Sequence, residues 1–267
     1  MNMLRNLLFL FAFMGLAQTA LADSKGLRQM TTGDDIRGWQ AVGRLEIGGK
    51  GFCTGALIAP DLVLTAAHCL FDKASKRRID HNRIEFRAGW RNGRAEAYRS
   101  IRQAVVHPDF EMKRDGALPD ADDLALLQLY HPIRTTAIRP YKTSVGLRRG
   151  DRVGVVSYAH DRAEVPSIQE GCEFLGHEKG LVVTSCNVDF GSSGAPIFSF
   201  ESGEPHIVSV VSAKADLNGQ PVALGMPLRE PLQLLLEVMQ MSSGHFVSSR
   251  ATPGQGRTTL SAKFVRP

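Results

Sequence analysis

The feature that most constrains the fold is a succession of short apolar runs separated by turn residues. Each run is rich in Val, Ile, Leu and Phe, and clusters of Gly, Pro, Asp or Arg divide it from the next. Such runs are typical of β-strands, and their spacing favours all-β barrels over β-α-β units. They form one group of Trp39–Ile47, Phe52–Ile58, Leu62–Ala66, Arg83–Gly89, Ala97–Val106 and Leu124–Tyr130, and a second of Arg152–Tyr158, Gly171–Leu175, Leu181–Asn187, Ala195–Ser199, Ile207–Ala213 and Pro221–Gly225.

Two other segments complete this predicted organisation. The stretch His131–Gly146 contains prolines and has no clear periodicity, so we expect it to cross from one barrel to the other. Apolar residues at helical spacing follow in Pro227–Met241, where Pro231 is tolerable only in a first turn. We therefore predict a terminal amphipathic helix. From residue 242 onward the Ser, Gly, Thr and Arg content predicts a poorly ordered tail, 242–267.

The amino terminus has the pattern of a secretory signal peptide, residues 1–22. Arg5 supplies the positive start, Leu7–Leu16 the apolar core and Ala20-Leu21-Ala22 the small-residue cleavage site. That core is shorter than the roughly 18 to 20 residues that span a bilayer, and no later stretch is long and apolar enough. We expect an exported protein, secreted or periplasmic, without a membrane span.

The charge balance is only mildly basic. The formal net charge of +5 becomes +4 once Arg5 is removed with the signal. No recognition motif accompanies this charge, so a nucleic-acid partner is not expected.

Three motifs far apart in the chain supply the residue types of an activated serine nucleophile. The segments are Gly191–Pro196 with Ser193, Thr65–Cys69 with His68, and Asp123–Leu127 with its leading aspartate. A serine hydroxyl needs an imidazole to take its proton and a buried carboxylate to hold that imidazole in the right tautomer. The chain order His, Asp, Ser also separates this layout from the subtilisin and α/β-hydrolase orders.

The glycines around the proposed nucleophile predict a second part of the site. Gly191 allows the backbone to turn sharply enough for the amides of Gly191 and Ser193 to point at one spot. Two such donors would form an oxyanion hole for a tetrahedral intermediate.

At these residues the chain resembles the chymotrypsin-like (trypsin-fold) serine peptidases, over about Trp39–Met239. Gly51–Ile58 and Val106–Phe110 match as well, and Gly-Ser-Ser-Gly-Ala-Pro is similar to the bacterial secreted trypsin-like and glutamyl-endopeptidase-like branch. The resemblance implies an all-β fold of two packed six-stranded antiparallel β-barrels with a C-terminal α-helix. It also implies an exported serine endopeptidase that works through an acyl-enzyme.

The expected domains follow from this resemblance and from the position of the crossover. Residues 23–138 would form an N-terminal β-barrel that carries His68 and Asp123, and residues 139–241 a C-terminal barrel and helix that carry Ser193.

Two neighbouring aspartates compete for the third catalytic role. In the family pattern the acid immediately precedes an apolar strand of the Leu-Ala-Leu-Leu type, which selects Asp123 over Asp122. Adjacent side chains on an extended chain also point to opposite faces, so only one of the two can enter the cleft. Of the other histidines, His107 is the plausible competitor of His68, but its setting resembles a structural loop of the family.

Substrate-binding residues are implied by the same resemblance. Ser212 aligns with the segment that runs antiparallel to a bound peptide and touches the catalytic aspartate, although an ordinary strand serine is an equal alternative. Asn187 would lie near the base of the specificity pocket, which puts a preference for Arg or Lys in doubt; Asp189 is a second candidate there. Lys214 could receive an acidic group, although a solvated lysine is the simpler interpretation.

Two positions depart from the family pattern. Val211 stands where glutamyl endopeptidases carry a histidine, so a glutamate preference is not supported. Ser192 replaces the aspartate that pairs with a freed amino terminus in animal enzymes, and no Ile-Val-Gly-Gly start occurs around residues 23–45. Maturation could therefore need only signal removal.

Four cysteines in an exported protein favour disulfides over metal ligands. They permit three pairings, and the resemblance implies the neighbouring ones, Cys53 with Cys69 and Cys172 with Cys186. No metal-ligand spacing such as His-Glu-x-x-His occurs, so no metal or other cofactor is expected.

The leading hypothesis is a serine endopeptidase with protein or peptide substrates, expected to be monomeric. The alternative is a catalytically silent homologue that serves as a binding module, against which a complete set of three catalytic residues argues. An α/β-hydrolase esterase would need the order Ser, Asp, His and a full Gly-x-Ser-x-Gly, where this chain has Ala195.

Overall fold

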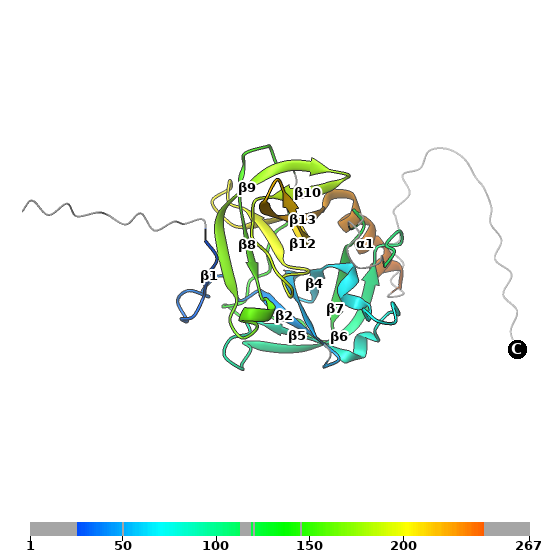
Figure 1. Cartoon of the computed structure of the whole chain (residues 1–267). Helices are drawn as coiled ribbons and strands as arrows, with labels where there is room; N and C mark the ends of the chain where they lie inside the picture. The colour runs from blue at the N-terminus through cyan, green and yellow to red at the C-terminus, as the bar shows by residue number, and fades with distance from the viewer. Residues whose placement is uncertain (1–25, 50, 113–118, 120, 145, 243–267) are drawn as a thin grey trace, which may run out of the picture.

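The fold consists of two closed antiparallel β-barrels and one helix, seen in a computed structural model that describes residues 26–49, 51–112, 119, 121–144 and 146–242 (Figure 1). The expected signal peptide, 1–22, and nearly all of the expected tail lie outside the described residues. The first barrel pairs its strands in the order β2-β3-β4-β7-β6-β5. These strands are β2 (Val42–Ile47), β3 (Phe52–Ala59), β4 (Leu62–Thr65), β5 (Ile84–Ala88), β6 (Ala97–Val106) and β7 (Ala125–Leu129).

The second barrel is closed by the pairing of β8 with β9. Its ring runs β8-β9-β10-β13-β12-β11, and the short β1 (Arg28–Gln29) adds to the outer edge of β9. The strands are β8 (Arg152–Ser157), β9 (Ser167–Glu178), β10 (Leu181–Thr184), β11 (Pro196–Ser199), β12 (His206–Leu217) and β13 (Gln220–Pro227). The expected all-β fold of two six-stranded barrels with a terminal helix is therefore confirmed.

One strand differs from its prediction for a clear physical reason. The run that we expected to begin at Gly171 is the second half of β9. Val153 pairs with Cys172 and Gly154 with Glu170, so Gly171 is the unpaired residue of a bulge, with φ of 84°. Glycine can mark a bulge as well as a strand end, and the sequence does not separate the two.

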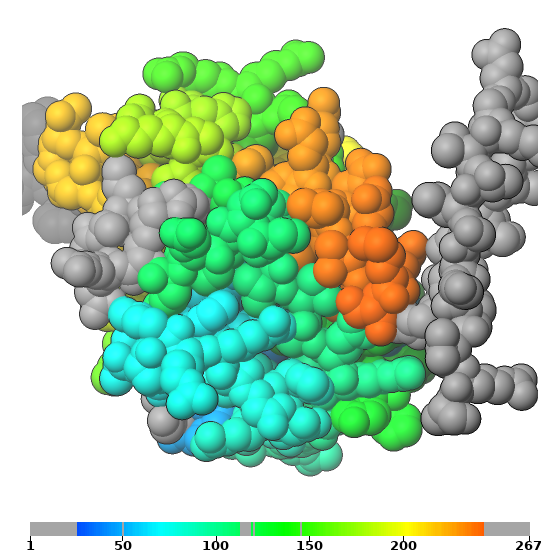
Figure 2. Space-filling model, turned by 90° about the vertical axis from the view of Figure 1, so that its right-hand side faces the viewer, coloured from blue at the N-terminus to red at the C-terminus, as the bar shows by residue number. Residues whose placement is uncertain are grey.

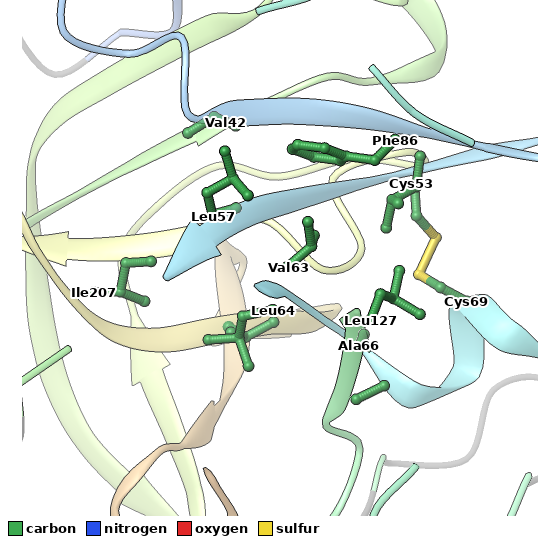
Figure 3. Close-up of a cluster of buried hydrophobic side chains, with 14 of the residues drawn as sticks. Val42, Cys53, Leu57, Val63, Leu64, Ala66, Cys69, Phe86, Leu127 and Ile207 are labelled. Atoms are coloured by element: carbon green, nitrogen blue, oxygen red, sulfur yellow. A yellow bond between two sulfur atoms is a disulfide. The ribbon is translucent and has the colours of Figure 1, made fainter. Parts of the chain in front are cut away.

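Alternation of buried and exposed side chains builds the core of the first barrel. Leu45, Leu57 and Phe86 are fully buried from three different strands. Gly43 lets the ring of Phe86 approach, because a Cβ there would lie 2.4 Å from that ring. Figure 3 shows Leu57 and Val63 in the same cluster as Ile207 of β12, so the apolar core continues across the seam between the barrels.

The C-terminal helix α1 (Arg229–Ser242) returns to the first barrel. Its buried side chains Leu232, Leu235 and Met239 recur at helical spacing, and Pro231 lies in its first turn as predicted. The helix contacts β6 and β7, and Figure 2 shows it (orange) on the surface beside the green segments of the first barrel. Within the described residues no helix is long and apolar enough to cross a membrane.

Candidate active site

The proposed base and acid come from the ends of two paired strands. His68 lies in a short 3₁₀ turn, Ala67–Leu70, just after β4, and Asp123 lies just before β7. Thr65 of β4 pairs with Ala125 of β7, so the two chain ends leave the barrel side by side. The disulfide between Cys53 and Cys69 ties β3 to the turn that carries His68; both expected disulfides are present.

Asp123 is buried and accepts three hydrogen bonds. The backbone N–H of His68 donates to Oδ1 at 2.8 Å, and Nδ1 of the imidazole lies 2.7 Å from Oδ2. The Ser212 hydroxyl, from β12 of the second barrel, also donates to Oδ2. With Nδ1–H donated to the carboxylate, Nε2 of the neutral imidazole carries the free lone pair that a general base needs.

The neighbouring Asp122 points elsewhere, as the alternation of side chains predicts. Its side chain is one-third exposed, and its Oδ1 lies 3.5 Å from Nδ1 of the buried His107. Asp122 and His107 therefore form a separate pair in the first barrel, outside the cluster of Asp123 and His68.

Ser193 lies in the turn before β11, against the strand that leads to His68. A Cβ on Gly194 would lie 2.1 Å from the Thr65 hydroxyl oxygen and 3.0 Å from the amide of Ala66, two residues before His68. Only glycine fits there, and its φ of 78° favours glycine too. In the part of the chain that the structure describes, the Ser193 hydroxyl makes no hydrogen bond, including none to His68.

The amides around Ser193 show which donors are free. From Asp189 to Ala195, each backbone N–H donates to another described residue except those of Gly191 and Ser193. The φ of Gly191 is 98°, and a Cβ there would lie 2.6 Å from the ring of Phe52. The two free donors are the ones that the sequence predicts for an oxyanion hole.

The residues that match a known family cover most of this constellation. The family described as "Trypsin-like peptidase domain" matches residues 53–206, which include His68, Asp123 and Ser193. This chain belongs to the trypsin-like peptidase family. The expected chymotrypsin-like fold is thereby confirmed.

Individual relatives match this chain over shorter stretches. A tryptase from Mus musculus is 37% identical over 83 residues, which cover 31% of this chain and 27% of the tryptase. A vitellin-degrading protease from Bombyx mori is 28% identical over 164 residues, 59% of this chain and 58% of that protein. The match thus spans less than two-thirds of the length of either relative. Both relatives are animal proteins, so the bacterial branch stays a prediction.

A solved structure matches this fold over almost the whole length of the solved chain. This chain superimposes on a structure titled "Structure of Glu endopeptidase in complex with MPD" with a TM-score of 0.64. The match covers 83% of this chain and 98% of that chain, at 17% sequence identity. At this identity the likeness concerns the fold alone.

The predicted specificity residues lie on two segments that an ion pair connects. Lys214 Nζ, on β12, lies 2.6 Å from Oδ1 of Asp189, four residues before Ser193. The hydrogen bond from Lys214, followed by that from the Phe190 amide, lowers the pKa of Asp189. Both side chains are half-exposed, so Lys214 is paired with Asp189 and also reaches solvent. Asn187 is exposed, and its amide donates to Gln169 Oε1 at 2.7 Å.

An aromatic ring beside this pair is a feature that sequence reasoning missed. Phe190 is 65% exposed, and its ring centroid lies 4.7 Å from Lys214 Nζ and 5.7 Å from Lys73 Nζ. Lys73 follows His68 in the first barrel, so the ring lies between cations from the two barrels. No local pattern in the sequence indicates this contact.

A metal has no ligand set here among the described residues. The one group of suitable donor atoms found consists of Cys53, Cys69 and His68, all within 4.8 Å of one another. Both sulfurs are joined in the disulfide and so cannot act as thiolate ligands.

Proposed function

We propose that this trypsin-like peptidase is an exported serine endopeptidase that cleaves peptide bonds through Ser193, His68 and Asp123. The observation that carries the proposal is the combination of a buried carboxylate that holds His68 with a serine turn whose free amides are those of Gly191 and of Ser193 itself. Each group has the role that acyl transfer requires.

The reaction follows from these positions. Ser193 Oγ attacks the carbonyl carbon of the scissile bond, and its proton passes to His68 Nε2. The resulting oxyanion accepts hydrogen bonds from the N–H groups of Gly191 and Ser193. When the intermediate collapses, the C–N bond breaks and His68 returns the proton to the leaving amine. Water then repeats the sequence on the acyl-enzyme and releases the acid and Ser193.

The carboxylate of Asp123 contributes by fixing and stabilising the base. Its bonds to the backbone and ring of His68 hold one tautomer and one orientation, and its charge stabilises the imidazolium that forms during attack. Ser212 adds a third donor from the opposite barrel.

We also propose Asn187, Ser212 and Lys214 as substrate-binding residues, with the peptide lying along β12. Export is supported by the signal pattern of residues 1–22 and by the two disulfides. The proposed domain division, 23–138 and 139–241, places His68 and Asp123 in one barrel and Ser193 in the other.

A labelling experiment tests the catalytic proposal. Mature protein is treated with a biotinylated peptidyl phosphonate and digested for mass spectrometry, with Ser193→Ala and the remote, exposed Ser202→Ala as matched variants. We expect the label on Ser193 in wild type and Ser202→Ala. Ser193→Ala should take no label, and its kcat should fall by on the order of 10⁶-fold.

The same experiment separates the alternatives. Folded wild-type protein that takes no label would support the silent binding module. Turnover retained by Ser193→Ala would refute the assignment of the nucleophile. A peptide-library cleavage profile of the wild-type protein would then define the residue preferred before the cut.

A further inference from the structure

Thr54 is a buried polar residue in an otherwise apolar part of β3, directly after the disulfide residue Cys53. Its hydroxyl donates to the carbonyl of Gly191 at 2.9 Å and accepts the amide of Tyr158 at 3.1 Å. Its own amide donates to the carbonyl of Ser193 at 2.9 Å. One residue of the first barrel thus contacts the turn of the second barrel at two successive points.

These contacts account for the orientation of the peptide groups around the nucleophile. The carbonyl of Gly191 is bound by the Thr54 hydroxyl, and the amide in the same peptide group, that of Ser192, donates to Asp189. The carbonyl of Ser193 is bound by the Thr54 amide, and the amide of Gly194 donates to Val211. Thr54 therefore holds two peptide groups that are bonded at both ends.

The two free amides belong to the peptide groups on either side of the one whose carbonyl the Thr54 hydroxyl binds. In a trans peptide the C=O and N–H point in opposite directions, so fixing the carbonyl fixes the amide. The carbonyl of Phe190 accepts from His160, and that of Ser192 accepts from Ala195, which turns the amides of Gly191 and Ser193 the other way. A rotation of any peptide group in this turn would disturb its neighbours, which Thr54 holds.

We propose that Thr54 is a positioning residue for the oxyanion hole: its hydroxyl keeps the free Gly191 and Ser193 amides in the orientation that an oxyanion would use. The inference rests on the proposed function, since it assigns a role to a residue that touches neither substrate nor reacting atoms. It goes beyond that function by making one barrel responsible for the oxyanion donors of the other.

Ser192, which lies between the two free amides, is also held by uncharged groups. Ser192 is fully buried, and its hydroxyl contacts the Ser157 hydroxyl at 3.1 Å and the Tyr158 carbonyl at 3.4 Å. Tyr158 also donates its amide to Thr54, so the two contacts meet at one segment after β8. Every partner named here is a backbone group or an alcohol.

The test compares substitutions that keep or remove the hydroxyl. Thr54→Val preserves the shape of the side chain and removes the donor, and Thr54→Ser keeps the donor without the methyl group. Thr184→Val is the matched control, because Thr184 is buried and its hydroxyl has no partner among the described residues. Active sites are counted with the phosphonate, so that unfolded protein does not enter kcat.

We expect a loss confined to the transition state. Removing one oxyanion donor in related chemistry costs about 10²- to 10³-fold in kcat, so loosening both donors in Thr54→Val should cost roughly 10- to 100-fold. KM should stay within about threefold, and Thr54→Ser and Thr184→Val should stay within about threefold of wild-type kcat. The affinity for a peptide aldehyde, whose hemiacetal oxygen uses the same donors, should fall with kcat.

Several results would overturn the proposal. Equal kcat in Thr54→Val and Thr54→Ser, a change in KM alone, or unchanged aldehyde affinity would each show that the hydroxyl does not position the donors. If Thr54→Val does not fold, Thr54→Ala against Thr54→Ser makes the same comparison, because both lack the methyl group. A wild-type protein without label or turnover would refute the proposed function instead. A crystal structure of Thr54→Val would test the positioning role directly, and an unchanged turn around Ser193 would contradict it.

Discussion

The two barrels contribute different kinds of groups to the proposed active site. The first provides the ionisable pair, His68 and Asp123, on the ends of β4 and β7. The second provides neutral groups, the alcohols of Ser193 and Ser212 and the free amides of the turn. Each set also receives a hydrogen bond from the opposite barrel. Ser212 donates to Asp123, and Thr54 donates to the turn that carries Ser193. The proposed proton-transfer groups and oxyanion donors therefore come from different barrels, and each set is also bonded by a residue of the opposite barrel.

The largest of these effects should come from disrupting the pair of His68 and Asp123. In Asp123→Asn we expect kcat to fall by about 10⁴-fold, because an amide in place of the carboxylate favours the wrong tautomer of His68. Asp122→Asn is the matched control, since its partner is His107. We expect it to stay within about threefold of wild type. Steady-state cleavage of a quenched fluorescent peptide measures both, and comparable losses in the two variants would contradict the choice of Asp123.

The two disulfides sharpen the comparison of the barrels. Their sequence separations are 16 and 14 residues, so each should contribute about 3 kcal/mol to the free energy of unfolding. Only the bond between Cys53 and Cys69 adjoins Thr54 and His68. Replacing that pair with alanine should therefore lower kcat about tenfold as well, through displaced catalytic groups.

Urea unfolding and active-site-corrected kcat separate these two consequences. Replacing Cys172 and Cys186 with alanine should lower stability by a similar amount and leave the kcat of the folded fraction within about twofold. A matching loss of kcat in both double variants would mean that the first disulfide has no special role in the site.

A smaller effect is expected from the serine that crosses the seam. Ser212→Ala removes one of three donors to Asp123, and the two bonds to His68 remain. We expect kcat to fall roughly fivefold, or about 1 kcal/mol. This is less than the roughly 1.5 to 3 kcal/mol of a hydrogen bond to a charged group, because two other donors still hold the carboxylate. Ser209→Ala, on the same strand, removes a bond to the Met226 carbonyl and should lower stability only. A loss of kcat in Ser209→Ala as large as in Ser212→Ala would point to a general effect on β12.

The sequence predicts the parts of this molecule that depend on local pattern. Alternating apolar runs predict the strands, and Gly191 and Gly194 predict the turn. Both signals are complete within a few consecutive residues. The signal at Gly171 was ambiguous, since a glycine in an extended run suits a bulge or a strand end. The family resemblance supplied the choice of Asp123 over Asp122.

The parts that escape prediction depend on partners distant in sequence. The Thr54 hydroxyl binds a carbonyl 137 residues away, and Lys214 pairs with Asp189 across 25 residues. A buried threonine in an apolar strand does indicate that a partner must exist, because buried polar groups are nearly always hydrogen-bonded. The sequence does not say which group that partner is.

The smallest effects are expected at the ion pair between Asp189 and Lys214. Both side chains are about half-exposed, so their interaction should be worth at most about 1 kcal/mol. If Lys214 binds an acidic substrate side chain, Lys214→Gln should raise KM for such peptides about two- to fivefold. Asp189→Asn should lower KM for the same peptides, because it frees the ammonium group. Equal KM changes for acidic and neutral peptides would exclude Lys214 as a specificity residue.

The pH dependence of this pair follows from the lowered pKa of Asp189. A carboxylate whose pKa is lower in the folded state stabilises that state above its unfolded pKa, about 3.9, and loses the effect as pH falls through the folded value. The KM difference between wild type and Asp189→Asn should therefore be constant from about pH 8 to pH 5. Peptide cleavage across this range measures it, and a difference that disappears near pH 6 would instead assign the ionisation to a histidine.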